Sequence, residues 1–230
     1  MKRRTSMLCV ALTWACVMWA NPLQKKVEKR LQGASEVLQQ VMSAPDRGIP
    51  EDVMEGAKCV AVIPHEIRGG LVFGARYGKG VATCRTEKGW SAPAFFTITG
   101  GSWGAQVGLE GVDNVLMIMN QKGMERLLSD KFQIGAQASV AAGPVGRHAS
   151  AGTDWKLETE ILSYARAKGV FVGVSLDGAW VRSDNEAMLA LYGPDASVRD
   201  VLLGNVAPPS SAHTFLAAVR SAELRAKKES

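Results

Sequence analysis

The fold class is decided by residues 59–100, CVAVIPHEIRGGLVFGARYGKGVATCRTEKGWSAPAFFTITG. Short runs rich in Val, Ile, Phe and Thr alternate here with clusters of glycine or proline, and they lie at 59–63, 70–76, 81–85 and 94–99. Apolar runs bounded by turn-forming residues are typical of β-strands. The YGKG sequence at 77–80 predicts a hairpin turn, because glycine readily adopts the positive φ that such turns require. This stretch therefore indicates a turn-rich antiparallel sheet.

The segments on both sides of this stretch complete the prediction. Residues 22–42 are a predicted amphipathic helix, because apolar residues recur every three or four positions: Leu23, Val27, Leu31, Ala34, Leu38 and Val41. Further strands are predicted at 115–119, 137–141, 157–164 and 170–176, and helices at 121–129, 185–191, 197–203 and 211–227. We expect an α+β fold. Its antiparallel sheet is either a partly closed barrel or a sandwich, with an N-terminal amphipathic helix and peripheral C-terminal helices.

The composition agrees with one globular domain. Of the 230 residues, 47% are hydrophobic and 21% are charged, which is the balance of an ordinary globular protein. The 24 glycines and an aromatic fraction of 7% favour turns and strand bulges over a helical bundle. We expect a signal peptide at 1–20, the folded domain at 22–204 and a helical extension at 205–230.

The first twenty residues have the layout of a secretory signal peptide. Three cations at positions 2–4 precede an apolar run at 7–20, which is shorter than the ~20 residues that a membrane-spanning helix needs. Two processing routes are open: cleavage after Ala20, or acylation of Cys16, which would make the chain a lipoprotein. Either route predicts an exported protein that is periplasmic or membrane-associated in the cell envelope.

Charge and cysteine content narrow the function classes. The formal net charge is +5, and it falls to +2 once the three cations of the signal peptide are removed. Because nucleic-acid binders usually carry a stronger basic footprint, no nucleic-acid partner is expected. The two remaining cysteines, Cys59 and Cys84, both lie in predicted strands. In an oxidising compartment they either form a disulfide or stay as two buried thiols.

One motif matches a catalytic pattern. The GGSWG sequence at 100–104 fits the G-x-S-x-G pattern of a serine hydrolase, with Ser102 as the nucleophile. That chemistry needs the serine between a strand and a helix, and the two glycines within 105–111 disfavour a helix there. His65, His148 and His213 do not have the spacing of a metal-protease motif. We therefore expect a protein that is not an enzyme and has no metal site or cofactor.

Several ordered motifs together resemble the SYLF-domain family. They are CVAVIP at 59–64, RGG at 68–70, GKGV at 78–81, GWSAP at 89–93, GSWGAQVG at 101–108, AAGPVGR at 141–147 and, after Tyr164, KGVFVGV at 168–174. The likeness covers residues 24–193, and the order of so many motifs makes it specific.

The resemblance implies non-enzymatic binding of acidic membrane lipids. Eukaryotic members of the family bind phosphoinositides, and some fungal members are also described as binding actin filaments. An exported chain without SH3 or FYVE modules looks like a bacterial branch of the family. Phosphatidic acid, phosphatidylglycerol or cardiolipin would then be the available acidic lipids, and actin is not an expected partner. The alternative function is a structural or protein-interaction module of the envelope.

Six cations are the predicted lipid-binding residues. They are Lys25, Lys26, Lys29, Arg30, Arg68 and Arg147. The first four surround the stripe of the N-terminal helix, a region that the family implicates in membrane contact, and flanking cations can reach lipid phosphates. The other two lie in family-like glycine-rich turns, where backbone N–H groups and a guanidinium can meet a phosphate. Two structural alternatives stay open: the helix docks its stripe on the sheet, and the 143–147 bend is only a tight turn.

Overall fold

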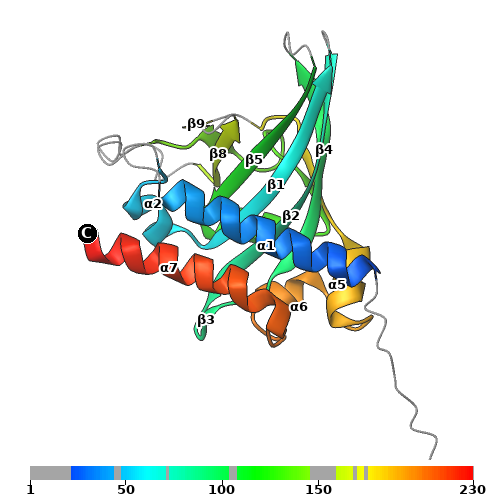
Figure 1. Cartoon of the computed structure of the whole chain (residues 1–230), viewed down its shortest axis with the longest axis vertical. Helices are drawn as coiled ribbons and strands as arrows, with labels where there is room; N and C mark the ends of the chain where they lie inside the picture. Colours follow the sequence, from blue (N-terminus) through cyan, green and yellow to red (C-terminus); the bar gives the residue numbers. More distant parts are fainter. Residues whose placement is uncertain are drawn as a thin grey trace, which may run out of the picture.

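The computed structural model describes residues 22–43, 48–70, 73–103, 108–145, 159–167, 170–173 and 176–229. The expected signal peptide, with Cys16 and Ala20, lies outside the described residues, and so does Arg147. Within them, a curled sheet is flanked by helices from both ends of the chain (Figure 1).

The sheet is a half-barrel with the strand order β6-β10-β4-β2-β1-β5-β8-β7. Its strands are β1 (Cys59–Gly70), β2 (Phe73–Thr86), β4 (Ala94–Trp103), β5 (Gly108–Ile118), β6 (Lys131–Gln133), β7 (Val140–Ala142), β8 (Ile161–Ala167) and β10 (Trp180–Ser183), with β3 (Gly89–Trp90) beside β2 and β9 (Val170–Gly173) beside β8. Among the described strands, pairing is antiparallel except between β7 and β8. Long strands project past the helices at one end (Figure 1). The predicted α+β class with a partly closed sheet is confirmed.

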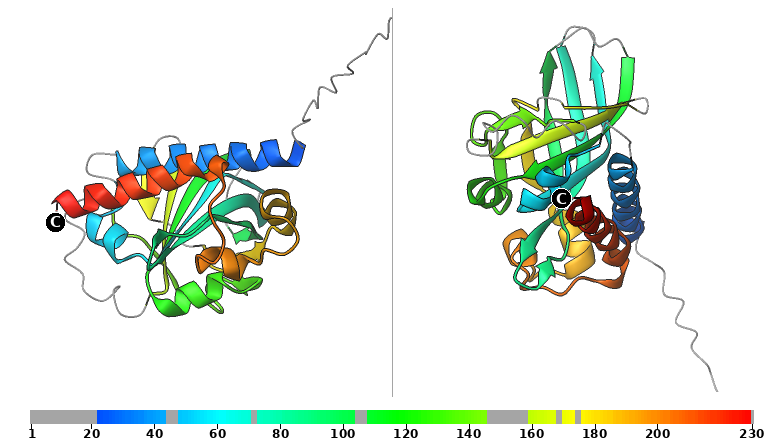
Figure 2. Two further views of the ribbon diagram at one scale, coloured as in Figure 1. Left: turned by 90° about the horizontal axis from the view of Figure 1, so that it is seen from below. Right: turned by 90° about the vertical axis from the view of Figure 1, so that its left-hand side faces the viewer.

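The two long helices share one hydrophobic core with the sheet. The helices are α1 (Pro22–Met42), α2 (Glu51–Gly56), α3 (Gln121–Leu127), α5 (Asn185–Tyr192), α6 (Val198–Leu202), the 3₁₀ helix η2 (Ser210–Ala212) and α7 (His213–Glu229). The stripe of α1 is buried from Val27 to Val41 and packs on α7, α5 and the sheet. Figure 2 shows α1 and α7 side by side, and α7 buries Phe215 and Val219. The 205–230 segment therefore contributes to the same core as the rest of the domain.

The hairpin predicted at 77–80 is wrong, because these residues lie within the continuous strand β2. Their glycines allow close packing between strands instead of a turn. A Cβ added to Gly80 would lie 2.3 Å from Cζ of Phe96, its register partner on β4. A Cβ added to Gly78 would lie 2.7 Å from Cγ2 of Ile63. Glycine inside a strand often marks such a close approach.

A bulge in β1 determines which side chains point inward from its second half. Relative to both neighbouring strands, β1 carries one extra residue around Pro64 and His65. His65 has a left-handed φ of 57°, and its backbone N–H donates to Oδ1 of Asp113 at 2.9 Å. Proline, which has no N–H for the ladder, is tolerated at such an irregularity. Directly after the bulge, Glu66 is completely buried.

Cys59 and Cys84 form a disulfide between β1 and β2. The two residues are register partners, and both are fully buried. Of the two alternatives that the sequence left open, the structure has the disulfide. For a sequence separation of 25 residues, such a cross-link stabilises the fold by about 3 kcal/mol, mainly by restricting the unfolded chain.

Candidate functional site

Three of the predicted lipid-binding cations form an exposed surface near the start of α1. Lys25, Lys26 and Lys29, called the lysine surface below, are exposed, whereas the apolar stripe of the same helix is buried. Exposed Glu28 lies between them in the sequence and accepts a hydrogen bond from Gln24 Nε2 at 3.4 Å. Positive charge therefore exceeds negative charge over this first part of α1.

Arg30 does not belong to the lysine surface, because its guanidinium points into the protein. Its side chain is only 8% exposed, and Nη2 lies 2.9 Å from Oδ2 of Asp184 at the start of α5. Nη1 donates to the carbonyl of Gly80 on β2 at 3.5 Å, and the guanidinium lies 5.4 Å from the ring centroid of Phe95. Arg30 thus attaches α1 to the sheet and to α5.

Asp184 balances the charge of Arg30 inside the protein. Its Oδ2 also accepts a hydrogen bond from Lys79 Nζ at 3.0 Å, and its Oδ1 accepts one from the backbone N–H of Ala187. Burial on its own would raise the pKa of Asp184, but the hydrogen bond from Lys79 and the charge of Arg30 together outweigh burial, so this pKa is lowered. The carboxylate is therefore ionised where it joins α1, β2 and α5.

Arg68 also lies in an internal ionic cluster, not in an exposed turn. Its Nε donates to Glu66 Oε1 at 2.9 Å, and its Nη2 donates to Asn114 Oδ1 at 3.1 Å. Asn114 Nδ2 in turn donates to Glu66 Oε2 at 2.6 Å. The side chain of Arg68 is 11% exposed, and Nε of Arg76 lies 3.8 Å from Glu66 Oε1. We call Glu66, Arg68, Arg76 and Asn114 the ionic cluster.

The sequence analysis missed most of these polar partners. Glu66 and Arg68 are two residues apart in a strand, which places both side chains on one face. This spacing is informative only because β1 continues past Pro64 to Gly70, which the residues around Pro64 do not predict. Asp184 gave no local signal, because its partner Arg30 is distant in the sequence.

The glycine-rich bend after β7 is described only in part. The backbone N–H of Gly143 donates to the carbonyl of Ser163 at 2.9 Å. A Cβ at this position would lie 2.1 Å from Cζ of Tyr164, so only glycine fits against that ring. This contact gives Gly143 a packing role. The predicted contact of Arg147 with an anion stays a prediction.

The position of Ser102 does not match the hydrolase motif. Ser102 lies within β4 and pairs with Gly74 of β2, so it is not at a turn from a strand into a helix. Within the described residues, no group of three or more His, Cys, Asp and Glu side chains could hold a metal ion.

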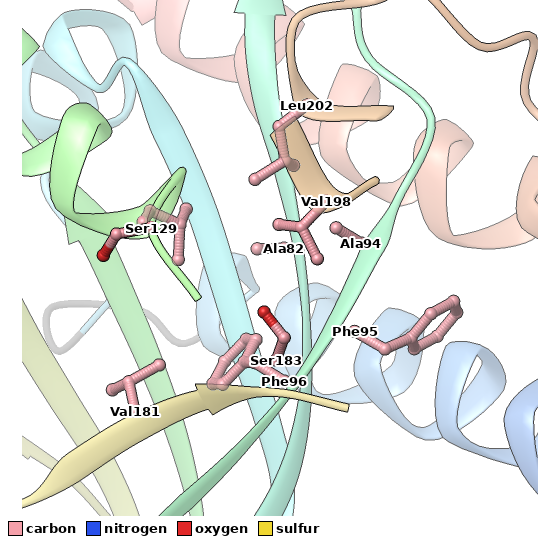
Figure 3. Close-up of a pocket in the computed structure, with 10 residues that line it drawn as sticks. Ala82, Ala94, Phe95, Phe96, Ser129, Val181, Ser183, Val198 and Leu202 are labelled. Atoms are coloured by element: carbon pink, nitrogen blue, oxygen red, sulfur yellow. The ribbon is translucent and has the colours of Figure 1, made fainter. Parts of the chain in front are cut away.

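An apolar pocket lies between β2, β4, β10, α3 and α6 (Figure 3). Its walls include Phe96, Val181 and Leu202, and the hydroxyl groups of Ser129 and Ser183 are its side-chain polar atoms. The enclosed space has room for about one water molecule at most, which is far too small for a lipid chain. The described residues that line this pocket include neither a nucleophile–base pair nor a cation. None of the helices in the described segments is long and apolar enough to cross a membrane.

Comparisons with known proteins indicate the same family as the sequence motifs do. The model of the Ysc84 family, described as "Las17-binding protein actin regulator", matches residues 99–222. Protein YSC84 of Saccharomyces cerevisiae (strain ATCC 204508 / S288c) is 32% identical over 212 residues, which cover 87% of this chain and 45% of that protein. LAS seventeen-binding protein 3 of the same strain is 31% identical over 199 residues, covering 82% of this chain and 43% of the relative.

An animal relative gives a similar result. SH3 domain-containing YSC84-like protein 1 of Homo sapiens is 28% identical over 199 residues, covering 84% of this chain and 58% of that protein. The chain thus spans less than half the length of the two yeast relatives. Because the family model matches more than half of the chain, and the ordered motifs of the SYLF domain extend across it, the chain belongs to the Ysc84 (SYLF-domain) family.

Proposed function

We propose that this protein binds acidic phospholipids at a membrane surface through the lysine surface of α1, without catalysing a reaction. The observation that carries the proposal is that the two faces of α1 differ in exposure and charge. Lys25, Lys26 and Lys29 are exposed together, while the apolar stripe is buried in the core. The resemblance of the ordered motifs to the SYLF-domain family implies lipid binding, and the N-terminal residues 1–20 support export to the envelope.

Binding of this kind is adsorption and not insertion. Each basic side chain near an anionic membrane contributes ~1 kcal/mol, so three lysines contribute at most about 3 kcal/mol. Moving the stripe of α1 into the acyl region would uncover the apolar side of α7, including Phe215 and Val219. The proposed complex is therefore weak and sensitive to salt unless an acyl group on Cys16 adds to it.

The test compares two charge-matched triple variants in vesicle co-sedimentation. Lys25→Gln, Lys26→Gln and Lys29→Gln together should reduce pelleting with phosphatidylglycerol vesicles about tenfold or more, because up to ~3 kcal/mol is lost. The control replaces the exposed residues Lys58, Lys88 and Arg182 by Gln. It has the same net charge, and it should pellet like the wild type. Equal loss in both variants would mean that overall charge, and not this surface, determines binding.

A protein-binding function is the second candidate. It is favoured by two exposed apolar residues that face each other across β1 and β2: Ile67 is 46% exposed and Tyr77 is 49% exposed. The description of the family model and the name of one yeast relative, LAS seventeen-binding protein 3, refer to Las17 binding. If this function is the correct one, pull-downs from envelope extract should recover a partner that Tyr77→Ser loses, while vesicles leave the wild type unbound.

A further inference from the structure

The ionic cluster holds more positive than negative charge inside the sheet. Arg68 on β1 and Arg76 on β2 are register partners, so two guanidinium groups lie on adjacent strands. Among the described side chains, Glu66 is the carboxylate that forms ion pairs with both. Like charges on paired strands repel each other, and burial increases the repulsion. One carboxylate cannot neutralise two guanidinium groups.

Arg76 is the member of the cluster without a sufficient partner. Its side chain is 8% exposed, and its Nε and Nη1 are buried with no hydrogen-bond acceptor. Both oxygens of Glu66 already accept hydrogen bonds, from Arg68 at 2.9 Å and from Asn114 at 2.6 Å. Burial lowers the pKa of Arg76, and the attraction of Glu66 only partly counteracts this effect. Buried N–H groups normally have an acceptor, so two unpaired ones on a cation indicate a missing acceptor.

A second chain segment lies beside Arg76. Gly100 on β4 is its register partner, and a Cβ added there would lie 3.5 Å from Cγ of Arg76 and 3.1 Å from Cα of Ala179. The turn that leads into β10 therefore packs close to the stem of Arg76. This turn includes Asp177, which is itself exposed and attracts Arg76. The stem of Arg76 thus lies close to a turn that reaches the surface.

We infer that Arg76, with Arg68 beside it, forms a binding site for one phosphate group, free or as part of a phosphate ester such as a lipid headgroup. A guanidinium is suited to this ligand because its N–H groups form charge-assisted hydrogen bonds to oxyanions. One phosphate would supply acceptors for Nε and Nη1 and neutralise the excess charge of the cluster. The site is separate from the lysine surface and does not depend on adsorption to a membrane.

The test measures how phosphate changes the thermal unfolding of the full chain. Sodium phosphate and sodium chloride are compared at equal ionic strength, because a ligand that binds only the folded state raises the unfolding midpoint. The wild-type midpoint should rise with phosphate. Arg76→Met should fold as well without phosphate, because it removes a buried charge that Glu66 neutralises only in part, and its midpoint should not respond to phosphate. An equal phosphate response in the wild type and Arg76→Met would overturn the proposal.

A second variant keeps the test decisive if Arg76→Met does not fold. Glu66→Gln removes the carboxylate that competes with the anion, so its midpoint should rise at a severalfold lower phosphate concentration than that of the wild type. No difference between Glu66→Gln and the wild type would count against the site. The Lys25, Lys26 and Lys29 triple variant should keep the full phosphate response, which separates failure of this proposal from failure of lipid adsorption.

The source of the phosphate is distinguished with a soluble lipid. Monomeric short-chain phosphatidic acid and inorganic phosphate are titrated separately against the wild type and Arg76→Met. A response to the lipid at lower concentration assigns a headgroup, and a response to inorganic phosphate alone assigns free phosphate. Either result supports the site if Arg76→Met loses it. A wild type that responds to neither ligand would contradict the proposal.

Discussion

Asp184 is the single residue on which several contacts between elements depend. It pairs with Arg30 of α1 and Lys79 of β2, and it caps α5 through the N–H of Ala187. The periodicity of α1 predicted that Lys26 and Arg30 flank the stripe and that Lys25 and Lys29 lie on the polar face. It could not show that Arg30 meets a carboxylate far along the chain, since such a partner is a product of tertiary structure. Local pattern therefore predicted the lysine surface but not this ion pair.

Replacing Asp184 separates its charge from its capping role. Asp184→Asn keeps a good N-cap but leaves Arg30 buried without a counter-ion, so we expect a loss of about 3 kcal/mol in the free energy of unfolding. Asp184→Ala should lose about 1 kcal/mol more, because the cap is also removed. Urea unfolding measures both values. The control Asp195→Asn, at an exposed position, should change stability by less than ~0.5 kcal/mol. The ion pair would be unimportant if Asp184→Asn behaved like this control.

The same carboxylate predicts how stability depends on pH. Because the pKa of Asp184 is lowered in the folded state, its stabilisation is present above the unfolded-state pKa of ~3.9 and is lost as pH falls through the folded-state pKa. The stability difference between the wild type and Asp184→Asn should thus stay constant from neutral pH to about pH 5. It should shrink at lower pH in urea titrations. A difference that grows on acidification would contradict the assigned ionisation.

At the scale of elements, the strands show which parts of the sheet the sequence patterns predicted and which parts they did not. The Val-rich run at 59–63 correctly predicted a strand, but Pro64 suggested its end, whereas a bulge lets β1 continue to Gly70. The short strands β6 and β10 went unpredicted, and the strand expected at 137–141 is only Val140–Ala142. Such short strands show too little alternation for a prediction, and their position depends on pairing with neighbours.

Two glycines in the long strands allow a matched test of this explanation. Gly80→Ala should lower the free energy of unfolding by about 1–3 kcal/mol, because the new Cβ would overlap the ring of Phe96. Gly101→Ala places its Cβ no closer than 3.8 Å to the neighbouring atom, so we expect a change within ~0.5 kcal/mol. Thermal or urea unfolding gives both numbers. Equal effects would show that strand glycines matter only through backbone freedom.

At the scale of the whole molecule, the C-terminal helix α7 is held by packing against α1, by a hydrogen bond from Ser35 Oγ of α1 to the carbonyl of Thr214 at 3.3 Å, and by polar contacts with β2 and β3. Glu223 of α7 accepts hydrogen bonds from Arg85 and from Trp90 Nε1, and the guanidinium of Arg85 lies 4.6 Å from the Trp90 ring centroid.

The sequence predicted the fold class from strand and helix patterns, and the family from ordered motifs. It did not predict strand order or the position of α7 beside α1, because no local pattern encodes which elements become neighbours.

Removing the C-terminal segment tests whether it is part of the folding unit. A chain that ends at residue 204 loses buried Phe215, Leu216 and Val219, each worth about 2 kcal/mol. Because total stabilities are only ~5–15 kcal/mol, we expect this chain to lack a cooperative unfolding transition in calorimetry. A control chain that ends at Ala226 keeps these contacts and should unfold cooperatively. A cooperative transition in the shorter chain would make 205–230 a dispensable extension.

The most direct measurement of the central claim is wild-type co-sedimentation with vesicles across headgroup charge and salt. We predict pelleting with phosphatidylglycerol vesicles at about 0.1 M salt, a large loss of pelleting at about 1 M salt, where the Debye length falls from ~10 Å to ~3 Å, and no pelleting with phosphatidylcholine vesicles. Equal pelleting with neutral and anionic vesicles, unchanged by salt, would contradict binding through the lysine surface.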